Sequence, residues 1–353
     1  MVTDSSSSST LPPATGSGHR DPLGALPLLT RAVVSFFFMI RNRAFRPDGT
    51  VNRFLLNLID WKSPPTPKPV GGVSSSDFTV EPSRNLWFRL FVPTTTADAG
   101  AGSLPLIIFF HGGGFSTLSP ASRPYDAFCR RIAGEASAVV ASVKYRLTPE
   151  HRFPSQYNDG FDALKFIAEN SASLLPENVD LTRCFIAGDS AGGNIAHHVA
   201  VRAAQGKKIG QAGARWRVRG LIAIQPFFGG SGRTESEIQF QKVGYLSVAR
   251  ADWHWRAFLP EGADRDHWAV NVSGPNGVDI SDLEDFPAAT LVLVGGTDPL
   301  HDWQVQYCEW LKRSGREAEL VEFPDMGHAF YVFPEIPESA QLISKVKDFV
   351  ARN

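Results

Sequence analysis

The sequence predicts an α/β fold in which a mostly parallel central sheet is flanked by helices. Short apolar stretches alternate with amphipathic helical stretches along most of the chain, which is the pattern of βαβ units. Residues 104–110 are apolar throughout, as expected for a strand that is covered on both faces of a sheet. A third observation is a glycine-rich strand-to-helix turn within residues 184–196, around which the rest of the chain is organised.

The order of the elements follows from these patterns of hydrophobicity. Strands are predicted near residues 77–80, 85–92, 104–110, 138–144, 184–188, 220–225, 290–295 and 318–323. Helices are predicted near residues 124–136, 159–171, 191–204, 302–314 and 339–351. Residues 226–289 interrupt the alternation and are rich in Trp, Phe, Gly and Asp. We expect a helical insertion there, which either shapes a binding pocket or packs against the sheet as an ordinary excursion.

The N-terminal part of the chain differs from the rest. Residues 1–25 are dominated by Ser, Gly, Pro and Thr, which indicates a disordered tail. Residues 26–68 contain two apolar helical stretches, separated by the Pro-Asp-Gly turn at 47–49. This segment is interpreted either as a lid over a site or as ordinary core packing. The main α/β domain, which we expect to carry the catalytic site, is predicted to span residues 69–353.

Composition excludes several classes of function. The chain of 353 residues has 35 basic and 36 acidic residues, so it offers no electrostatic reason to bind nucleic acid. No apolar stretch is long enough to span a membrane, and the N-terminus lacks the features of a signal peptide. The three cysteines are widely spaced and match no metal-binding pattern, which favours reduced thiols. We therefore expect a cytoplasmic or nuclear protein.

The turn at 188–192 carries the candidate nucleophile, Ser190. Its sequence, Gly-Asp-Ser-Ala-Gly, fits the pattern G-x-S-x-G, in which a sharp turn between a strand and a helix exposes the serine hydroxyl. The flanking glycines leave room for this turn, and the N-terminus of the following helix favours negative charge nearby. Alone, the pattern also fits a glycine-rich connection without chemistry. Asp189 is interpreted as an anchor of the turn rather than as a group that transfers protons.

Backbone donors for an oxyanion are predicted in a second glycine-rich loop. His111-Gly-Gly-Gly-Phe115 directly follows the apolar strand, and glycines there let backbone N–H groups approach a substrate oxygen closely. The N–H groups of Gly112, Gly113 and Gly114 are candidates, together with that of Ala191, which follows the nucleophile. The alternative is a plain glycine turn.

An acid and a base are predicted from two late loops. Asp298 follows one late strand and is the candidate carboxylate, while Asp302 is interpreted as an acid in the first turn of the next helix or its N-cap. His328 follows the next strand and is the candidate general base. The order Ser190, Asp298, His328 along the chain is the order of the catalytic triad in α/β-hydrolases.

These motifs resemble the plant carboxylesterases of the hormone-sensitive-lipase-like branch, which also contains the soluble gibberellin receptors. The shared stretches lie within residues 30–350. Besides the glycine loop and the serine turn, they are the first-helix region, 46–52, 58–62, 83–86, 145–154, 233–237 and 302–304. The resemblance implies an α/β-hydrolase fold under an N-terminal lid, with no metal and no organic cofactor.

The receptors in this branch supply the main alternative function. They resemble esterases in which a small aliphatic residue replaces the catalytic histidine, and in which the lid closes over a hormone and presents a surface to a protein partner. The present chain keeps His328, and it has Gly114 where receptors tend to have serine. Its segment 246–252 also lacks the acidic–basic pair associated with hormone binding.

The predicted function is therefore that of a serine carboxylesterase, which hydrolyses small apolar esters through an acyl-enzyme on Ser190. A small-molecule ester is the expected ligand, and a protein partner is expected only under the receptor alternative. Phe115, Tyr125 and Tyr331 are expected to line the substrate pocket. A third hypothesis is a flavonoid dehydratase, which is disfavoured because such relatives often have threonine in place of Ser190.

Overall fold

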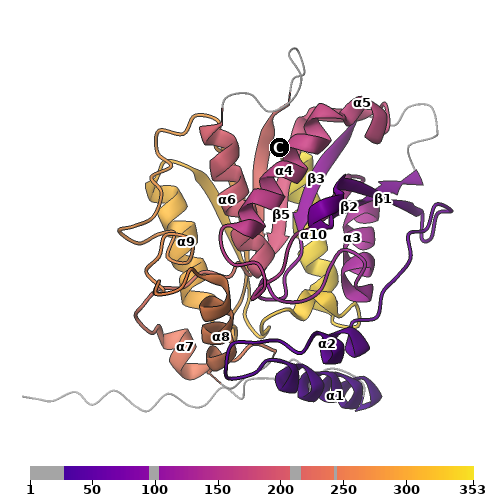
Figure 1. Ribbon diagram of the computed structural model, residues 1–353. Coiled ribbons are helices and arrows are strands. Elements are labelled where there is room, and N and C mark those ends of the chain that lie inside the picture. Colours follow the sequence, from indigo (N-terminus) through magenta and orange to yellow (C-terminus); the bar gives the residue numbers. More distant parts are fainter. Residues whose placement is uncertain (1–27, 95–102, 207–215, 242–244) are drawn as a thin grey trace, which may run out of the picture.

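The computed structural model describes residues 28–94, 103–206, 216–241 and 245–353. The predicted N-terminal tail, residues 1–25, lies outside these ranges. The described residues form one sheet of eight strands in the order β1-β2-β4-β3-β5-β6-β7-β8, with helices on both faces (Figure 1). The sequence-based prediction of a mostly parallel α/β sheet flanked by helices is confirmed.

All eight predicted strands are present, and two of them begin four or five residues earlier than predicted. They are β1 (Val73–Glu81), β2 (Leu86–Pro93), β3 (Leu104–Phe110), β4 (Val139–Lys144), β5 (Val179–Asp189), β6 (Val218–Ile224), β7 (Ala289–Gly295) and β8 (Glu317–Phe323). Within this sheet, β2 pairs antiparallel with both of its neighbours, while the pairs from β4 to β8 are parallel. Every residue of β3 is buried, as its continuous apolar sequence predicts.

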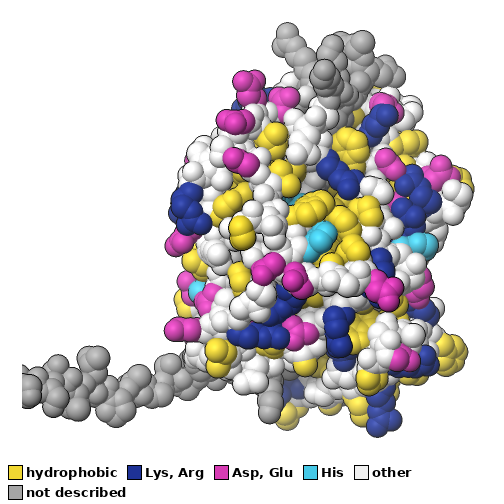
Figure 2. Space-filling model, turned by 60° about the vertical axis from the view of Figure 1, so that its left-hand side comes forward, with side chains coloured by type: hydrophobic (Ala, Val, Ile, Leu, Met, Phe, Trp, Pro, Cys, Tyr) yellow, Lys and Arg dark blue, Asp and Glu magenta, His cyan; other side chains and the backbone are white. Residues whose placement is uncertain are grey.

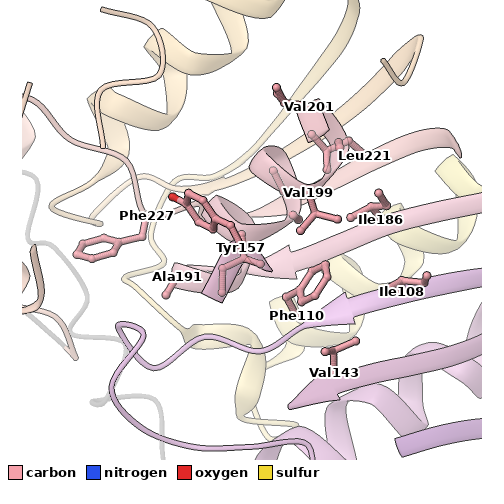
Figure 3. Close-up of a cluster of buried hydrophobic side chains, with 14 of the residues drawn as sticks. Ile108, Phe110, Val143, Tyr157, Ile186, Ala191, Val199, Val201, Leu221 and Phe227 are labelled. Atoms are coloured by element: carbon pink, nitrogen blue, oxygen red, sulfur yellow. The ribbon is translucent and has the colours of Figure 1, made fainter. Parts of the chain in front are cut away.

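Helices cover the sheet in two layers. One layer consists of α3 (Arg123–Glu135) and α10 (Pro337–Arg352), and the other of α4 (Ser155–Glu169), α6 (Ala191–Gln205) and α9 (His301–Arg313) (Figure 1). The short helix α5 (Ser171–Leu174) follows α4. Each layer has its own hydrophobic core, because alternate strand residues face opposite sides of the sheet. In Figure 3, Ile108, Phe110 and Ile186 on the strands lie near Tyr157 and Val199 on the helices of the second layer.

The predicted insertion between β6 and β7 is only partly helical. It contains α7 (Glu235–Gln239) and α8 (Val248–Phe258), and the remainder of its described part consists of turns and loops. The glycine and aspartate content that distinguished this segment in the sequence accounts for these turns. Its aromatic residues are largely buried, so the segment adds to the core next to the sheet rather than forming an exposed excursion.

The two N-terminal helices, α1 (Leu28–Ala44) and α2 (Arg53–Ile59), pack against this insertion rather than against the sheet. They lie near α8 below the main body in Figure 1. Phe45 meets Trp253 of α8 edge to face, with 4.7 Å between ring centroids. The Trp253 indole also donates a hydrogen bond to the Arg46 carbonyl (2.7 Å). With Leu56, Ala44 and Ala257, these rings form a third, small hydrophobic cluster.

Charged side chains of both signs are interspersed over the face shown in Figure 2. This agrees with the near-balanced formal charge of −1. None of the helices in the described ranges is long and apolar enough to cross a membrane.

Replacing Trp253 tests how the N-terminal helices are attached. We expect Trp253→Ala to raise the rate of proteolytic cleavage within residues 28–59 about tenfold or more, because it removes both the ring contact and the hydrogen bond to Arg46. Trp253→Phe keeps an aromatic ring and is expected to have an intermediate effect. Limited proteolysis with mass spectrometry measures both rates, and equal rates in all three proteins would contradict this attachment.

Candidate active site

The candidate nucleophile lies on the turn between β5 and α6. Ser190 adopts φ 51° and ψ −119°, which is an unfavourable backbone conformation for a residue with a side chain. Two glycines make the turn possible: a Cβ at Gly188 would lie 2.2 Å from the Gly192 carbonyl oxygen, and one at Gly192 would lie 1.9 Å from the Phe110 carbonyl oxygen. The pattern G-x-S-x-G is thus explained by close backbone approach on both sides of the serine.

The structure brings the three predicted triad residues together. His328 Nε2 lies 2.9 Å from Ser190 Oγ, and His328 Nδ1 lies 2.7 Å from Asp298 Oδ2. Asp298 is completely buried, while Ser190 and His328 each keep a small exposed fraction at the bottom of a pocket. Since a carboxylate can only accept hydrogen bonds, it holds the Nδ1–H tautomer and leaves Nε2 free to take the serine proton.

Neighbouring groups fix the acid and the base in place. Asp298 accepts hydrogen bonds from the Leu300 backbone N–H (2.9 Å) and from Gln304 Nε2 (3.0 Å). The loop that carries His328 is held by the buried Gln225, which donates to the Gly327 carbonyl (3.1 Å) and accepts from the Ala329 N–H (2.7 Å). Sequence reasoning did not single out Gln225, and its only signal was its position directly after a strand.

The second aspartate of this region has a different role. Asp302 lies in the first turn of α9 and accepts a hydrogen bond from the Ser236 backbone N–H (2.9 Å), so it links α9 to α7. It makes no contact with His328. This geometry agrees with its interpretation as a first-turn acid and does not support an N-cap, because the N-cap residue of α9 is Leu300.

The predicted set of oxyanion donors needs one correction. The Gly112 N–H donates to Asp189 Oδ1 and to the Tyr125 hydroxyl, both at 2.8 Å, so it is not available to a substrate. By contrast, the N–H groups of Gly113, Gly114 and Ala191 have no acceptor among the described residues. Ala191 is the first residue of α6, where the backbone N–H groups point outward without partners in the helix.

Asp189, next to the nucleophile, is the hub of a buried hydrogen-bond network. Its carboxylate accepts from Gly112 N–H and from the hydroxyls of Tyr125 (2.6 Å) and Tyr331 (2.7 Å). Burial raises the pKa of this carboxyl to about 6, although the tyrosine and backbone donors act in the opposite direction. This network agrees with the interpretation of Asp189 as an anchor of the turn.

Two adjoining cavities lead away from Ser190. The smaller one, of about 90 Å³, contains the serine, His328, Tyr125 and Tyr331. The larger one, of about 950 Å³, lies between the N-terminal helices and the adjacent end of the sheet. Both cavities are lined by Arg41, Leu118, Pro124, Tyr245 and Val332, which therefore mark the junction between them.

The pocket prediction is wrong for one of its three aromatic residues. Phe115 is completely buried, stacks on Phe258 with 4.0 Å between ring centroids, and lines neither cavity. Its backbone turns at φ 59°, which directs the ring into the core. Two residues that the sequence did not indicate, Arg41 and His254, line the smaller cavity instead. The sequence predicts a helix for the segment that contains Arg41 and a helical insertion for the segment that contains His254, but not the packing that brings these side chains to the cavity at Ser190.

Among the described residues there is no group of three or more His, Cys, Asp or Glu side chains that could hold a metal ion. The three cysteines, Cys129, Cys184 and Cys308, are buried and free.

A mostly parallel sheet with a serine on a strained strand-to-helix turn, next to an Asp–His pair from later loops, defines an α/β hydrolase. The family described as "alpha/beta hydrolase fold" matches residues 107–332. The chain belongs to this family, in the hormone-sensitive-lipase-like branch that contains plant carboxylesterases and gibberellin receptors. The predicted family and the predicted α/β-hydrolase fold are confirmed.

Relatives of both kinds cover nearly the whole chain. Gibberellin receptor GID1C of Arabidopsis thaliana is 40% identical over 339 residues, covering 92% of this chain and 94% of the receptor. Carboxylesterase 20 of the same plant is 32% identical over 309 residues, covering 86% of this chain and 93% of the esterase. Among solved structures, an esterase of Pyrobaculum calidifontis matches with a TM-score of 0.69 at 26% identity, covering 92% of this chain and 98% of its own.

The raised pKa of Asp189 predicts a specific pH dependence of stability. A carboxyl that titrates near pH 6 when folded and near 3.8 when unfolded binds its proton more tightly in the folded state. Its contribution to stability is therefore present below about pH 4 and is lost as the pH rises to about 6.

Relative to Asp189→Asn, the unmodified protein should thus lose up to about 3 kcal/mol of unfolding free energy between pH 4 and pH 7. Urea denaturation of both proteins at several pH values measures this difference. Because all other groups cancel in the comparison, parallel stability curves would mean that the Asp189 carboxyl titrates normally.

Proposed function

We propose that this protein is a serine carboxylesterase, which hydrolyses small apolar carboxylic esters through an acyl-enzyme on Ser190. The observation that carries the proposal is the continuous hydrogen-bonded relay from Ser190 Oγ through the His328 ring to Asp298. Each of these groups is held by further hydrogen bonds or by the backbone turn, so the relay is arranged before a substrate binds.

In the proposed reaction, His328 Nε2 takes the proton from Ser190 as Oγ attacks the ester carbonyl carbon. Negative charge then develops on the carbonyl oxygen, where the N–H groups of Gly113, Gly114 and Ala191 are placed to stabilise it. Removing one such donor typically costs about 3–4 kcal/mol of transition-state stabilisation. The imidazolium, stabilised by Asp298, next protonates the leaving alkoxide, and a water molecule repeats the sequence to release the acid.

Two features support a small acyl or alcohol group next to the serine. The cavity at Ser190 has only about 90 Å³, and aromatic and aliphatic side chains such as Phe227 and Leu246 form part of its wall. The larger cavity leaves room for a bulkier group on the other side of the ester bond. We further propose a cytoplasmic or nuclear location, which the three free cysteines support.

A second candidate is a hormone-binding protein that resembles the gibberellin receptors. Its support is the 40% identity to a gibberellin receptor over 92% of the chain. In this alternative, α1 and α2 act as a lid over the larger cavity, as the lining residues Phe37, Phe38 and Leu56 allow. We rank it second for two reasons. His328 completes the relay, and a Cβ at position 114 would lie only 2.5 Å from the His254 ring. The serine that the receptors tend to have at this position therefore does not fit here without a shift of that ring.

The esterase proposal predicts turnover of a chromogenic acetyl ester such as 4-nitrophenyl acetate. Ser190→Ala and His328→Val should each lower kcat by about 10³-fold or more, because each removes a group that acts in the transition state. Asp298→Asn should also lower kcat strongly, since the amide no longer holds the Nδ1–H tautomer. Initial rates at 400 nm measure these effects, and background rates in all four proteins would remove the esterase proposal.

The receptor alternative predicts a response to a gibberellin instead. An added gibberellin should slow proteolysis within residues 28–59 severalfold if the N-terminal helices close over it. The same experiment with Ser190→Ala distinguishes binding from turnover. Unchanged digestion at millimolar gibberellin would eliminate this alternative.

A further inference from the structure

A buried arginine with no acidic partner in the described part of the chain lies at the junction of the two cavities. Arg41, near the end of α1, has 8% of its surface exposed and lines both the cavity at Ser190 and the larger cavity. No carboxylate among the described residues lies within 4 Å of its guanidinium. Its one hydrogen bond there is long, from Nη1 to the Tyr245 carbonyl (3.5 Å), and its buried Nε has no partner.

Aromatic rings account for only part of this arrangement. The Arg41 guanidinium lies 4.4 Å from the Tyr245 ring centroid and 5.8 Å from that of Phe45, which stabilises its charge by cation–π contact. Such contacts leave the N–H groups at the edge of the guanidinium unsatisfied. A guanidinium has five donors, and leaving several of them unpaired in a buried site is costly.

Nearby groups add to the positive charge instead of balancing it. Arg250 of α8 also lies over the Phe45 ring, with its guanidinium 4.5 Å from the ring centroid. It donates a hydrogen bond to the Asn42 side-chain oxygen (3.1 Å). Burial, together with the nearby charge of Arg41, lowers the pKa of Arg250 to about 10. Burial also lowers the pKa of His254 well below its usual range, with added effects of Arg41 and Arg250, so this histidine stays neutral.

Several other cations that line the larger cavity are paired with acids. Arg53 contacts Glu150, Lys62 contacts Asp60 at 2.5 Å, and Arg84 contacts Asp162 at 2.7 Å. Arg41 differs from these three in being more buried and in having no acid within 4 Å among the described residues. A protein site built in this way is suited to a ligand that supplies the missing negative charge.

We propose that Arg41 binds a carboxylate of the substrate, so that the preferred substrates are esters that carry a second, free carboxylate on an apolar body. This inference rests on the proposed esterase function and specifies its substrate class. The ester bond would lie at Ser190 in the smaller cavity, and the carboxylate would meet the Arg41 N–H groups at the junction. One guanidinium among apolar walls suits a singly charged carboxylate better than a doubly charged phosphate, which needs more donors.

Matched pairs of esters test the proposal. Mono-4-nitrophenyl glutarate and 4-nitrophenyl pentanoate differ in that a carboxylate replaces a terminal methyl group on the acyl side. The acetyl ester of 3-hydroxybenzoate and phenyl acetate differ by a carboxylate on the alcohol side. In at least one pair, the acidic ester should have a kcat/KM about tenfold or more above that of its neutral partner, as expected for a charged hydrogen bond.

Variants then assign this preference to the proposed residue. Arg41→Met should bring the ratio of kcat/KM between the acidic and the neutral ester of a pair close to one, and Arg41→Lys should retain part of the preference, because a charge remains without the planar fork. Arg43→Met is the matched control, since Arg43 lies two residues away on the same helix with an exposed side chain. A thermal melt of each variant shows whether it is folded.

Binding to the Ser190→Ala protein separates this inference from the proposed function. Isothermal titration calorimetry with the same ester pairs should give tighter binding of an acidic ester, and this difference should disappear in Ser190→Ala/Arg41→Met. If neutral esters are hydrolysed but neither acidic ester is preferred in binding or turnover, the inference is overturned and the esterase proposal stands. If no ester is hydrolysed, the esterase proposal fails, and the calorimetry alone decides whether Arg41 binds a carboxylate.

Discussion

The arrangement of the site depends on one buried carboxylate, that of Asp189. It accepts hydrogen bonds from the glycine loop after β3, from Tyr125 of α3 and from Tyr331, which lies three residues beyond His328. These segments are far apart in the sequence, and Asp189 joins them to the end of β5 directly beside the nucleophile. Because all its partners are donors, the carboxylate is satisfied although it has almost no contact with solvent.

This hub also explains why the glycine loop has its observed shape. By accepting the Gly112 N–H, Asp189 fixes the start of the loop, and the backbone then turns through positive φ angles at Gly113 (103°) and Gly114 (60°). The next two N–H groups have no acceptor among the described residues. The run of glycines alone indicates that such a loop is possible. Which of its N–H groups is occupied by a hydrogen bond within the protein is decided by Asp189, which lies 77 positions after Gly112 in the sequence.

Much of the fold could be predicted because the buried strands of a parallel sheet are continuously apolar and its covering helices are amphipathic, so both leave a pattern in the sequence. The buried strand β3 and the helices α3, α6, α9 and α10 begin and end within a few residues of the predicted boundaries. The positions of Ser190, Asp298 and His328 followed from motif and chain order, since carboxyl ends of parallel strands meet at one edge. In contrast, the direction of the Phe115 side chain depends on a backbone turn and on stacking against Phe258 of α8, and the junction at Arg41 depends on where α1 lies. No local sequence pattern records either.

The third hydrophobic cluster, formed by Ala44, Phe45, Leu56, Trp253 and Ala257, separates one wall of the cavity from the rest of the site. The reacting groups are mounted on the sheet and its own helices, whereas the wall that contains Arg41 belongs to a separate packing unit formed by α1, α2 and α8. Under the proposed function, substitutions that reshape this unit would alter which molecules are bound without moving Ser190, Asp298 or His328. Such a separation between the groups proposed to react and the groups proposed to select a ligand would be compatible with relatives that are named as a gibberellin receptor and as a carboxylesterase.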